Sequence, residues 1–343
     1  MKKLIVASVF FISMSAVKAQ DYDFADYQTK ADVAESEKDI HRDRQKMKDN
    51  QISSIKVFTY KSDSAESLID GYRSAERNYD AEGNMTEFRF FKKNGKIKEH
   101  YKYQYDTNGK DIGFEDWKSN GNLRRKLIYS YDSSGNLTDQ RDYWRKPGDL
   151  CWHSIANYDN KQNLLELKFL GKNDSKDWGR FVYTYYPDGS KKQTIEYGSK
   201  NKVRHIWNFD CNPVGKLDGS TLKDTSKICV RYETDKDGNK IKIKEENTNE
   251  GKYRRIISKY NQSNNLIDVA GYDSKERMKY HSHSTFDGKN NITEYIVYRR
   301  NSTETKQRNI YHYDTSGNLT ELLIYKKSAL PDHILKFNYL RQQ

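Results

Sequence analysis

The sequence has few cysteines, which could crosslink the chain, and few prolines, which interrupt helices and strands. Its 343 residues include three cysteines and four prolines. Cys151, Cys211 and Cys229 allow at most one internal disulfide, and nothing in the sequence fixes the pair, although Cys211 and Cys229 are the nearer two. A chain with so few covalent links must therefore be held together by strand pairing and side-chain packing.

The chain also lacks a strong excess of charge in any one region. It carries 61 basic and 49 acidic residues and a formal net charge of +12, with both signs interspersed along its length. A basic chain favours acidic glycans or nucleic acid as contacts. No nucleic-acid motif accompanies these charges, so the pattern indicates a solvated surface and no nucleic-acid partner.

Long apolar runs are missing after the N-terminus. The opening "MKKLIVASVFFISMSAVKAQ" has a basic start, a short apolar run and small residues before Gln20, which predicts a signal peptide over residues 1–19, cut after Ala19. We therefore expect an exported protein without a membrane span, in the periplasm, on the outer surface or secreted, and a monomer. Residues 20–52 are highly charged without an apolar stripe, which predicts a helical or flexible spacer before a repeat domain over 53–343.

One phrase recurs throughout that domain. "YDSSGNLT" at 131–138 has counterparts at intervals of 24 to 27 residues. The first residues of the repeated phrases, here called anchors and numbered position zero, are Tyr79, Tyr105, Tyr131, Tyr158, Tyr185, Phe209, Thr234, Tyr260, Phe286 and Tyr313, with Tyr339 opening a final stub. Recurrence at a fixed period indicates a repeat architecture.

Each repeat predicts two strands and two turns. The runs before and after each anchor alternate and are rich in aromatic and branched residues, while Asp, Gly and Asn clusters mark the joints. Simple alternation places positions +6, +8, +10 and +12 on one face. The sequence therefore predicts an all-β fold, an antiparallel hairpin meander of about ten repeats, forming a curled strip or an incomplete shell because large flat sheets are unfavourable.

The repeated phrase resembles the YD repeats of the RHS family of exported bacterial proteins. The resemblance is carried by "YDAEGNMT", "YDTNGK", "YDSSGNLT", "YDNKQNLL", "FDGKNNIT" and "YDTSGNLT". It implies a large β-sheet strip or shell. The repeats here are longer than the usual YD unit and no toxin domain follows them, so a short stand-alone array is the closer likeness.

Residues that could carry chemistry follow the repeat. His100, His153 and His281 each lie five residues before an anchor, which predicts separate places in one row and no shared metal. "HSH" at 281–283 could hold a surface zinc or copper ion, but it lacks a full ligand set. Acidic residues recur at +8, as in Glu87 and Asp139, which favours cross-strand pairing with Lys or Arg over catalysis. We expect no enzyme activity, no catalytic residue, no metal and no cofactor.

Two functions remain open from the sequence. The first is a non-enzymatic exported scaffold that binds a glycan or another surface protein through its sheet. The second is a structural envelope component associated with a secretion or toxin system, using an uncovered terminal strand near 333–340; hydrolysis of a polysaccharide is a weaker alternative. The ligand-binding candidates are the aromatic side chains at +12, namely Phe91, Trp117, Tyr143, Tyr197, Tyr272, Tyr298 and Tyr325. Internal packing is the competing explanation for these rings.

Overall fold

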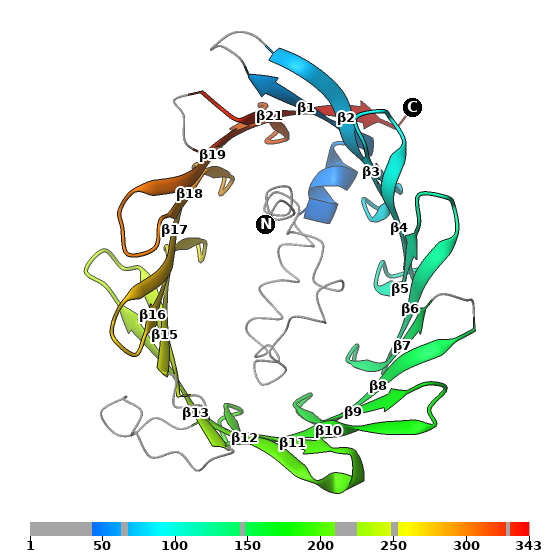
Figure 1. The fold of residues 1–343 in the computed structure, drawn as a ribbon, viewed down its shortest axis with the longest axis vertical. Coiled ribbons are helices and arrows are strands. Elements are labelled where there is room, and N and C mark those ends of the chain that lie inside the picture. The colour runs from blue at the N-terminus through cyan, green and yellow to red at the C-terminus, as the bar shows by residue number, and fades with distance from the viewer. Residues whose placement is uncertain are drawn as a thin grey trace.

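The protein is an all-β molecule whose strands close into a ring (Figure 1). The computed structural model describes residues 43–62, 68–144, 148–209, 225–247, 253–326 and 330–342. The strands are β1 (Ile52–Ser62), β2 (Leu68–Tyr79), β3 (Met85–Phe91), β4 (Ile97–Tyr105), β5 (Asp111–Trp117), β6 (Leu123–Tyr131), β7 (Leu137–Trp144), β8 (Leu150–Tyr158), β9 (Leu164–Gly171), β10 (Lys176–Tyr185), β11 (Lys191–Gly198), β12 (Val203–Phe209), β13 (Thr225–Thr234), β14 (Lys240–Asn247), β15 (Tyr253–Tyr260), β16 (Leu266–Asp273), β17 (Met278–Phe286), β18 (Ile292–Tyr298), β19 (Thr305–Tyr313), β20 (Leu319–Tyr325) and β21 (His333–Arg341), with a short 3-10 helix η3 (Ser199–Asn201) after β11. The predicted signal peptide and most of the predicted spacer lie outside the described residues.

Closure of the ring corrects the expectation of an open strip. The last strand, β21, pairs with β20 on one side and with β1 on the other, where Tyr339 lies opposite Ile55 and Phe337 opposite Val57. The terminal segment predicted to be an uncovered edge is therefore an internal strand. Closure removes the sheet edges that would otherwise be open to other chains.

One parallel contact interrupts the meander. Among the described strands, β12 and β13 run parallel, with Ile206 to Phe209 opposite Thr225 to Ile228, and every other neighbouring pair is antiparallel. A closed ring with an odd number of strands requires at least one parallel pair, because directions cannot alternate all the way round. The sequence predicted a hairpin after every anchor, and the repeat after Phe209 departs from that rule.

A β-bulge in most repeats resets the alternation of side chains. Pairing shifts register beside the anchor, as between Asn78 and Tyr79, so Met85 lies opposite Tyr79 while Glu87 lies opposite Asn78. The extra residue moves position +6 to the face of the anchor and leaves +8 and +10 on the other face. The prediction that +6, +8, +10 and +12 share one face is therefore wrong at +6.

The two faces of the sheet differ in composition. The tyrosine face holds the anchors and the residues at −4, −2, +9 and +11. Its buried members include Phe88, Phe114, Leu127 and Leu322, each at most 2% exposed. The ion-pair face holds the residues at −5, +8 and +10. Burial of large apolar side chains on the tyrosine face provides the main packing energy of the sheet.

Anchor tyrosines also join each repeat to the one before it. The hydroxyl of Tyr131 donates to the backbone oxygen of Asp111 at 2.7 Å, and Tyr158 donates to that of Leu137 at 2.9 Å. The same bond to the +6 carbonyl of the preceding repeat is made by Tyr105, Tyr185, Tyr313 and Tyr339. The carbonyl lies next to the bulge, so the hydroxyl satisfies an oxygen that the shifted pairing leaves available.

The turns that follow the anchors form one rim of the ring, here called the turn rim. In the turn after Tyr131, Asp132 accepts hydrogen bonds at 2.8 Å from the backbone of Asn136 and at 2.9 Å from its side chain, and these bonds lower the pKa of Asp132. Gly135 has φ of 85°, which glycine adopts without strain. The predicted turn chemistry is confirmed here.

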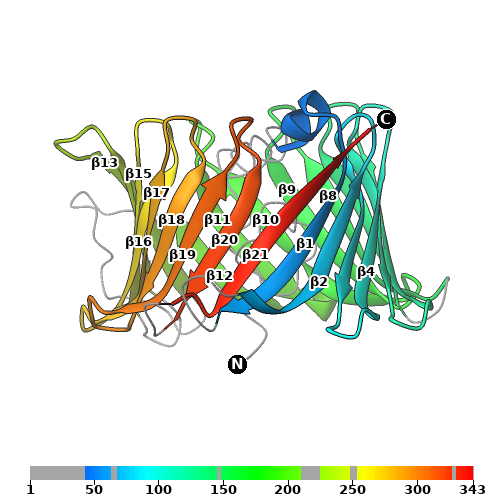
Figure 2. The ribbon, with the colours of Figure 1, turned by 90° about the horizontal axis from the view of Figure 1, so that it is seen from above.

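A short helix over residues 43–49 lies at the turn rim, inside the ring in Figure 1 and level with the rim in Figure 2. Arg44 donates to the backbone oxygens of Glu82 and Gly109 at 3.3 and 3.2 Å, and Lys46 donates to that of Gly317. Met47 packs against the core of the tyrosine face. The tyrosine face is therefore the inner face here, and the charged helix is fixed to the barrel, which its composition did not predict.

Candidate binding surface

The ion-pair face carries the residues that the sequence singled out for chemistry. Its acidic residues at +8 bond directly to the cationic residues at −5 of the next anchor. Glu166 lies 2.9 Å from Arg180, and Glu294 lies 2.5 Å from Arg308. Glu321 instead approaches Lys336, at −3 of the next anchor, to 3.9 Å. The predicted pairing of +8 carboxylates with Lys or Arg is confirmed at these positions.

Histidine takes the place of the cation in three repeats. His100 Nε2 lies 2.7 Å from Glu87 Oε1, and His281 Nε2 lies 3.0 Å from Asp268 Oδ2. His153 is 4% exposed and bonds with both ring nitrogens, to Asp139 at 2.6 Å and to Asp174 at 2.7 Å. Each histidine binds a carboxylate of its own repeat, so the three are not brought together.

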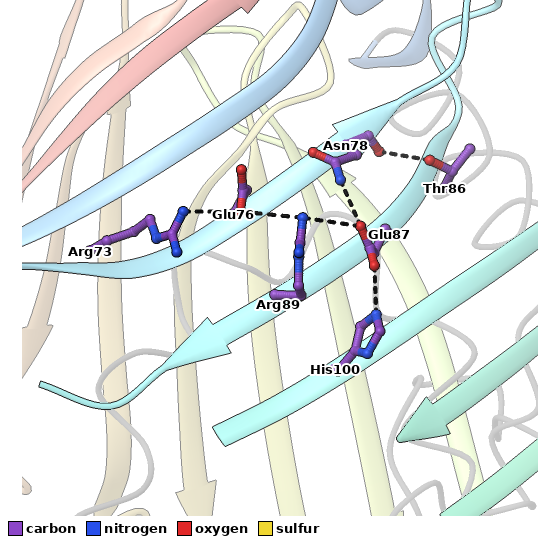
Figure 3. Close-up of polar contacts among 7 residues, drawn as sticks. All are labelled: Arg73, Glu76, Asn78, Thr86, Glu87, Arg89 and His100. Atoms are coloured by element: carbon purple, nitrogen blue, oxygen red, sulfur yellow. Dashed lines mark hydrogen bonds and ion pairs between the residues drawn. The ribbon is translucent and has the colours of Figure 1, made fainter. Parts of the chain in front are cut away.

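Around Glu87 these contacts extend over three strands, as Figure 3 shows. Glu87 accepts a bond from the side-chain amide of Asn78 at 2.6 Å, besides its contact with His100. Arg89 lies 3.3 Å from both Glu87 and Glu76, and Arg73 reaches Glu76 at 3.4 Å. Most of these side chains are half-buried, so the network fixes the directions in which its charges point.

The aromatic candidates at +12 stand beside these pairs, near the rim opposite the turn rim. Cations lie over four of the rings, with Arg73 4.1 Å from the centre of Phe91, Lys102 5.2 Å from Trp117, Arg180 4.5 Å from Tyr197 and Arg255 5.0 Å from Tyr272. The His281 ring stacks on Tyr298, with 4.5 Å between the ring centres. Arg308 lies opposite Tyr325 in the register of β19 and β20. Such contacts hold both the ring and the cation in place.

The candidates are distributed around the ring and do not form one patch. Phe91 is buried, whereas Trp117, Tyr143, Tyr197, Tyr272, Tyr298 and Tyr325 are each partly exposed. Neighbouring members such as Trp117 and Tyr143 stand on β5 and β7, with one strand between them. The structure therefore arranges them as a row along one rim.

Three sets of a +8 carboxylate, the Arg or His at −5 of the next anchor and the +12 ring of the following repeat meet on this face, and each set is here called a triplet. The triplets are Glu87 with His100 and Trp117, Glu166 with Arg180 and Tyr197, and Asp268 with His281 and Tyr298. Each of the three positions was visible separately in the sequence. The sequence did not reveal that they meet, because the bulge that aligns them cannot be recognised from alternation alone.

The pair of histidines at 281 and 283 shares one carboxylate oxygen. Asp268 Oδ2 lies 3.0 Å from His281 and 3.3 Å from His283, a carboxylate that the sequence did not place there. Among the residues that the structure describes, no group of three or more His, Cys, Asp or Glu side chains is arranged to hold a metal ion. Both imidazoles contact Asp268, and that of His281 also stacks on Tyr298.

Cys151 is free, and Cys229 is disulfide-bonded, while Cys211 lies outside the described residues. Within the described ranges, no helix is long and apolar enough to cross a membrane.

Comparison with known proteins gives only distant structural likenesses. No model of a known protein family matches the chain, and no curated protein matches it. The TcdB2-TccC3-TEV structure matches with a TM-score of 0.30 and 11% identity over 78% of this chain and 18% of the other. The Photorhabdus luminescens Tc holotoxin pore matches with 0.30 and 12% over 78% and 17%. A porin-like protein from Bacteroides uniformis matches with 0.31 and 7% over 85% and 97%.

These likenesses carry no argument about what the protein does. The chain spans less than a fifth of the length of the Tc toxin chains it matches. The closed all-β ring described above rests on this chain's own strand pairing.

Proposed function

We propose that the protein is a non-enzymatic, exported scaffold that binds a glycan or a partner protein through the ion-pair face of its closed sheet. The observation that supports this best is that the triplet occurs three times on this face, on β3–β5, β9–β11 and β16–β18. A catalytic site is built once, whereas a surface for an extended ligand repeats. Closure supports face binding further, because β21 has no free edge to offer a partner.

The geometry of the triplets suits a polymeric ligand. Triplets that are neighbours along the chain stand six or seven strands apart on the ring, which is about 30 Å at ~4.8 Å per strand, so an extended ligand could contact more than one. Each Arg or His side chain is held between a carboxylate and a ring, so little side-chain freedom is lost when a ligand binds. The partly exposed rings offer stacking surfaces to sugars or apolar side chains, and the cations offer donors to acidic groups.

The test is a binding measurement on the mature protein with panels of acidic and neutral polysaccharides. Trp117→Ala should abolish binding of the recognised glycan while the melting temperature changes little, since Trp117 is only half-buried. Ile128→Ala is the matched control, because Ile128 is 36% exposed on the same face but belongs to no triplet. It should leave binding unchanged.

Two outcomes would count against the proposal. Binding that survives Trp117→Ala, Arg180→Ala and Tyr298→Ala would place the ligand elsewhere. Loss of fold in all three variants, with no ligand found by wild-type protein, would assign the triplets to packing alone.

A further inference from the structure

One side chain on the inner face departs from its repeat. Position +6 is apolar in most repeats, as in Met85, Leu137 and Leu164, but is Asp111 in the repeat that begins at Tyr105. Asp111 Oδ1 accepts one hydrogen bond, from the backbone nitrogen of Gly113 at 3.1 Å. No cation of the described residues bonds to this carboxylate, and burial raises its pKa to about 7.

Tyrosines surround this carboxylate. Tyr105 lies directly opposite Asp111 in register, and the hydroxyl of Tyr131 bonds to the Asp111 backbone. Tyr103 and Tyr129 are each 7% exposed, and their buried hydroxyl oxygens have no hydrogen-bond partner. A buried hydroxyl without a partner costs free energy, as does a desolvated carboxylate without a counter-ion, so a polar ligand that paired with both groups would be stabilised here.

Another repeat shows which group fits between such rings. In the repeat that begins at Tyr185, position +6 is Lys191, and its ammonium lies 5.4 Å from the centre of Tyr183 and 5.1 Å from that of Phe209. The equivalent rings around Asp111 are Tyr103 and Tyr131. The inner wall therefore accommodates an ammonium between the −2 ring and the next anchor, and at Asp111 the chain supplies a carboxylate there instead.

We propose that Asp111, Tyr103, Tyr129 and Tyr131 form a binding site for a primary ammonium group, carried by a small amine or by the lysine of a peptide. The carboxylate neutralises the ammonium, the two free hydroxyls accept its N–H donors, and the rings contact its charge through their faces. Lys110 covers one face of the Tyr131 ring, with its ammonium 4.0 Å from the ring centre, but it bonds to the Gly135 carbonyl and makes no bond to the Asp111 carboxylate. The site is on the inner face and does not depend on the proposed function of the ion-pair face.

The test uses the mature protein with methylammonium chloride, potassium chloride at equal ionic strength, and an acetylated Gly-Lys-Gly amide. At pH 8, methylammonium should raise the melting temperature in a saturable way, and potassium should not. In Asp111→Asn the affinity should fall by roughly tenfold or more, which corresponds to ~1.4 kcal/mol. Tyr103→Phe should weaken binding to a smaller extent and leave the fold intact, because it removes only an unpartnered hydroxyl.

A second readout separates specific binding from general stabilisation. Binding at pH 7 should displace a proton from Asp111, which calorimetry detects as a heat that depends on the ionisation enthalpy of the buffer. Saturation by the lysine peptide alone would identify a protein partner as the source, and saturation by methylammonium alone a free amine. An equal response to potassium, an unchanged response in Asp111→Asn, or no proton release would overturn the proposal.

Discussion

The burial of Asp111 predicts a specific pH dependence of stability. Desolvation raises the pKa of this carboxyl from 3.8 to about 7 in the folded protein. Between those values the native state holds a proton that the unfolded state has lost, so the free energy of unfolding falls as pH rises and then becomes constant above about pH 7. Three pKa units at 1.36 kcal/mol each give a loss of about 4 kcal/mol.

Replacing Asp111 by Asn should remove this loss, since the amide is neutral and its oxygen can still accept the Gly113 hydrogen bond. Tyr103, Tyr105 and Tyr129 face the site, and their raised pKa values keep them neutral in this range. Urea unfolding from pH 4 to pH 8 should therefore show Asp111→Asn gaining about 4 kcal/mol over wild type as pH rises.

The control is Asp132→Asn, at an exposed turn carboxyl whose pKa is lowered by bonds to Asn136. Its contribution is complete above its unfolded value and is lost only at lower pH, so its difference from wild type should be constant from pH 5 to pH 8. If Asp111→Asn were equally flat across this range, the carboxyl would not be desolvated and the reasoning would be refuted.

Three further substitution pairs test the packing of the ring. Tyr131→Phe should lower the free energy of unfolding by about 1 kcal/mol, because it leaves the Asp111 carbonyl without its hydrogen bond. Tyr129→Phe should leave it unchanged, because the Tyr129 hydroxyl has no partner. Equal losses of unfolding free energy in urea would contradict the bond between repeats. Asp142→Ala should cost about 3–5 kcal/mol because it leaves Arg125 without its bidentate partner at 2.7 to 3.0 Å. Glu304→Ala, in an exposed pair with Arg299, should cost under about 1 kcal/mol, and similar melting temperatures of the two variants would argue against burial of the first pair. Gly179→Ala should cost more than about 1 kcal/mol, since φ is 123° and the new Cβ would meet the Tyr197 carbonyl at 2.1 Å, and Gly288→Ala, with open space, should be neutral.

The strands and turns could be predicted from the sequence because every repeat carries its own strand and turn signals. The Asp132 to Asn136 turn, the strands on either side and the aromatic ends of the strands follow from turn chemistry and alternation. A single copy of the strand and turn pattern is a weak signal, but its repetition at one period predicts the all-β class clearly. The pairing of +8 carboxylates with cations followed from the same regularity.

Features that depend on more than one repeat could not be predicted from the sequence. The bulge found beside most anchors inserts one residue between Tyr79 and Glu87, for example, and this shift decides which side chains share a face. Closure depends on the accumulated twist of all strands, so the contact between Ile55 and Tyr339 leaves no local pattern. The parallel contact of β12 with β13 follows from the odd number of strands. The evenly spaced anchors predicted a hairpin in every repeat and gave no sign of this contact.

The triplets were missed for the same reason. The sequence placed His100 and Glu87 in separate rows and treated Trp117 as a stacking ring on its own. Their meeting required the register of β3 with β4 and of β4 with β5. The unusual position of Asp111 was visible as the one acidic residue among the +6 residues, but its meaning needed the two unpartnered tyrosine hydroxyls beside it.

Disulfide trapping across β1 and β21 tests the closed ring most directly. Lys56 lies opposite Asn338, and directly paired strand residues are ~4.5–5.5 Å apart between Cα atoms, within the range of a disulfide. In a Cys151→Ser background, Lys56→Cys with Asn338→Cys should form a reducible crosslink that changes mobility on a denaturing gel, and Lys56→Cys with Lys168→Cys should not. A closed sheet predicts near-complete crosslinking of the first pair in the native protein, whereas two freely alkylated cysteines at 56 and 338 in folded protein would show that the ring is open.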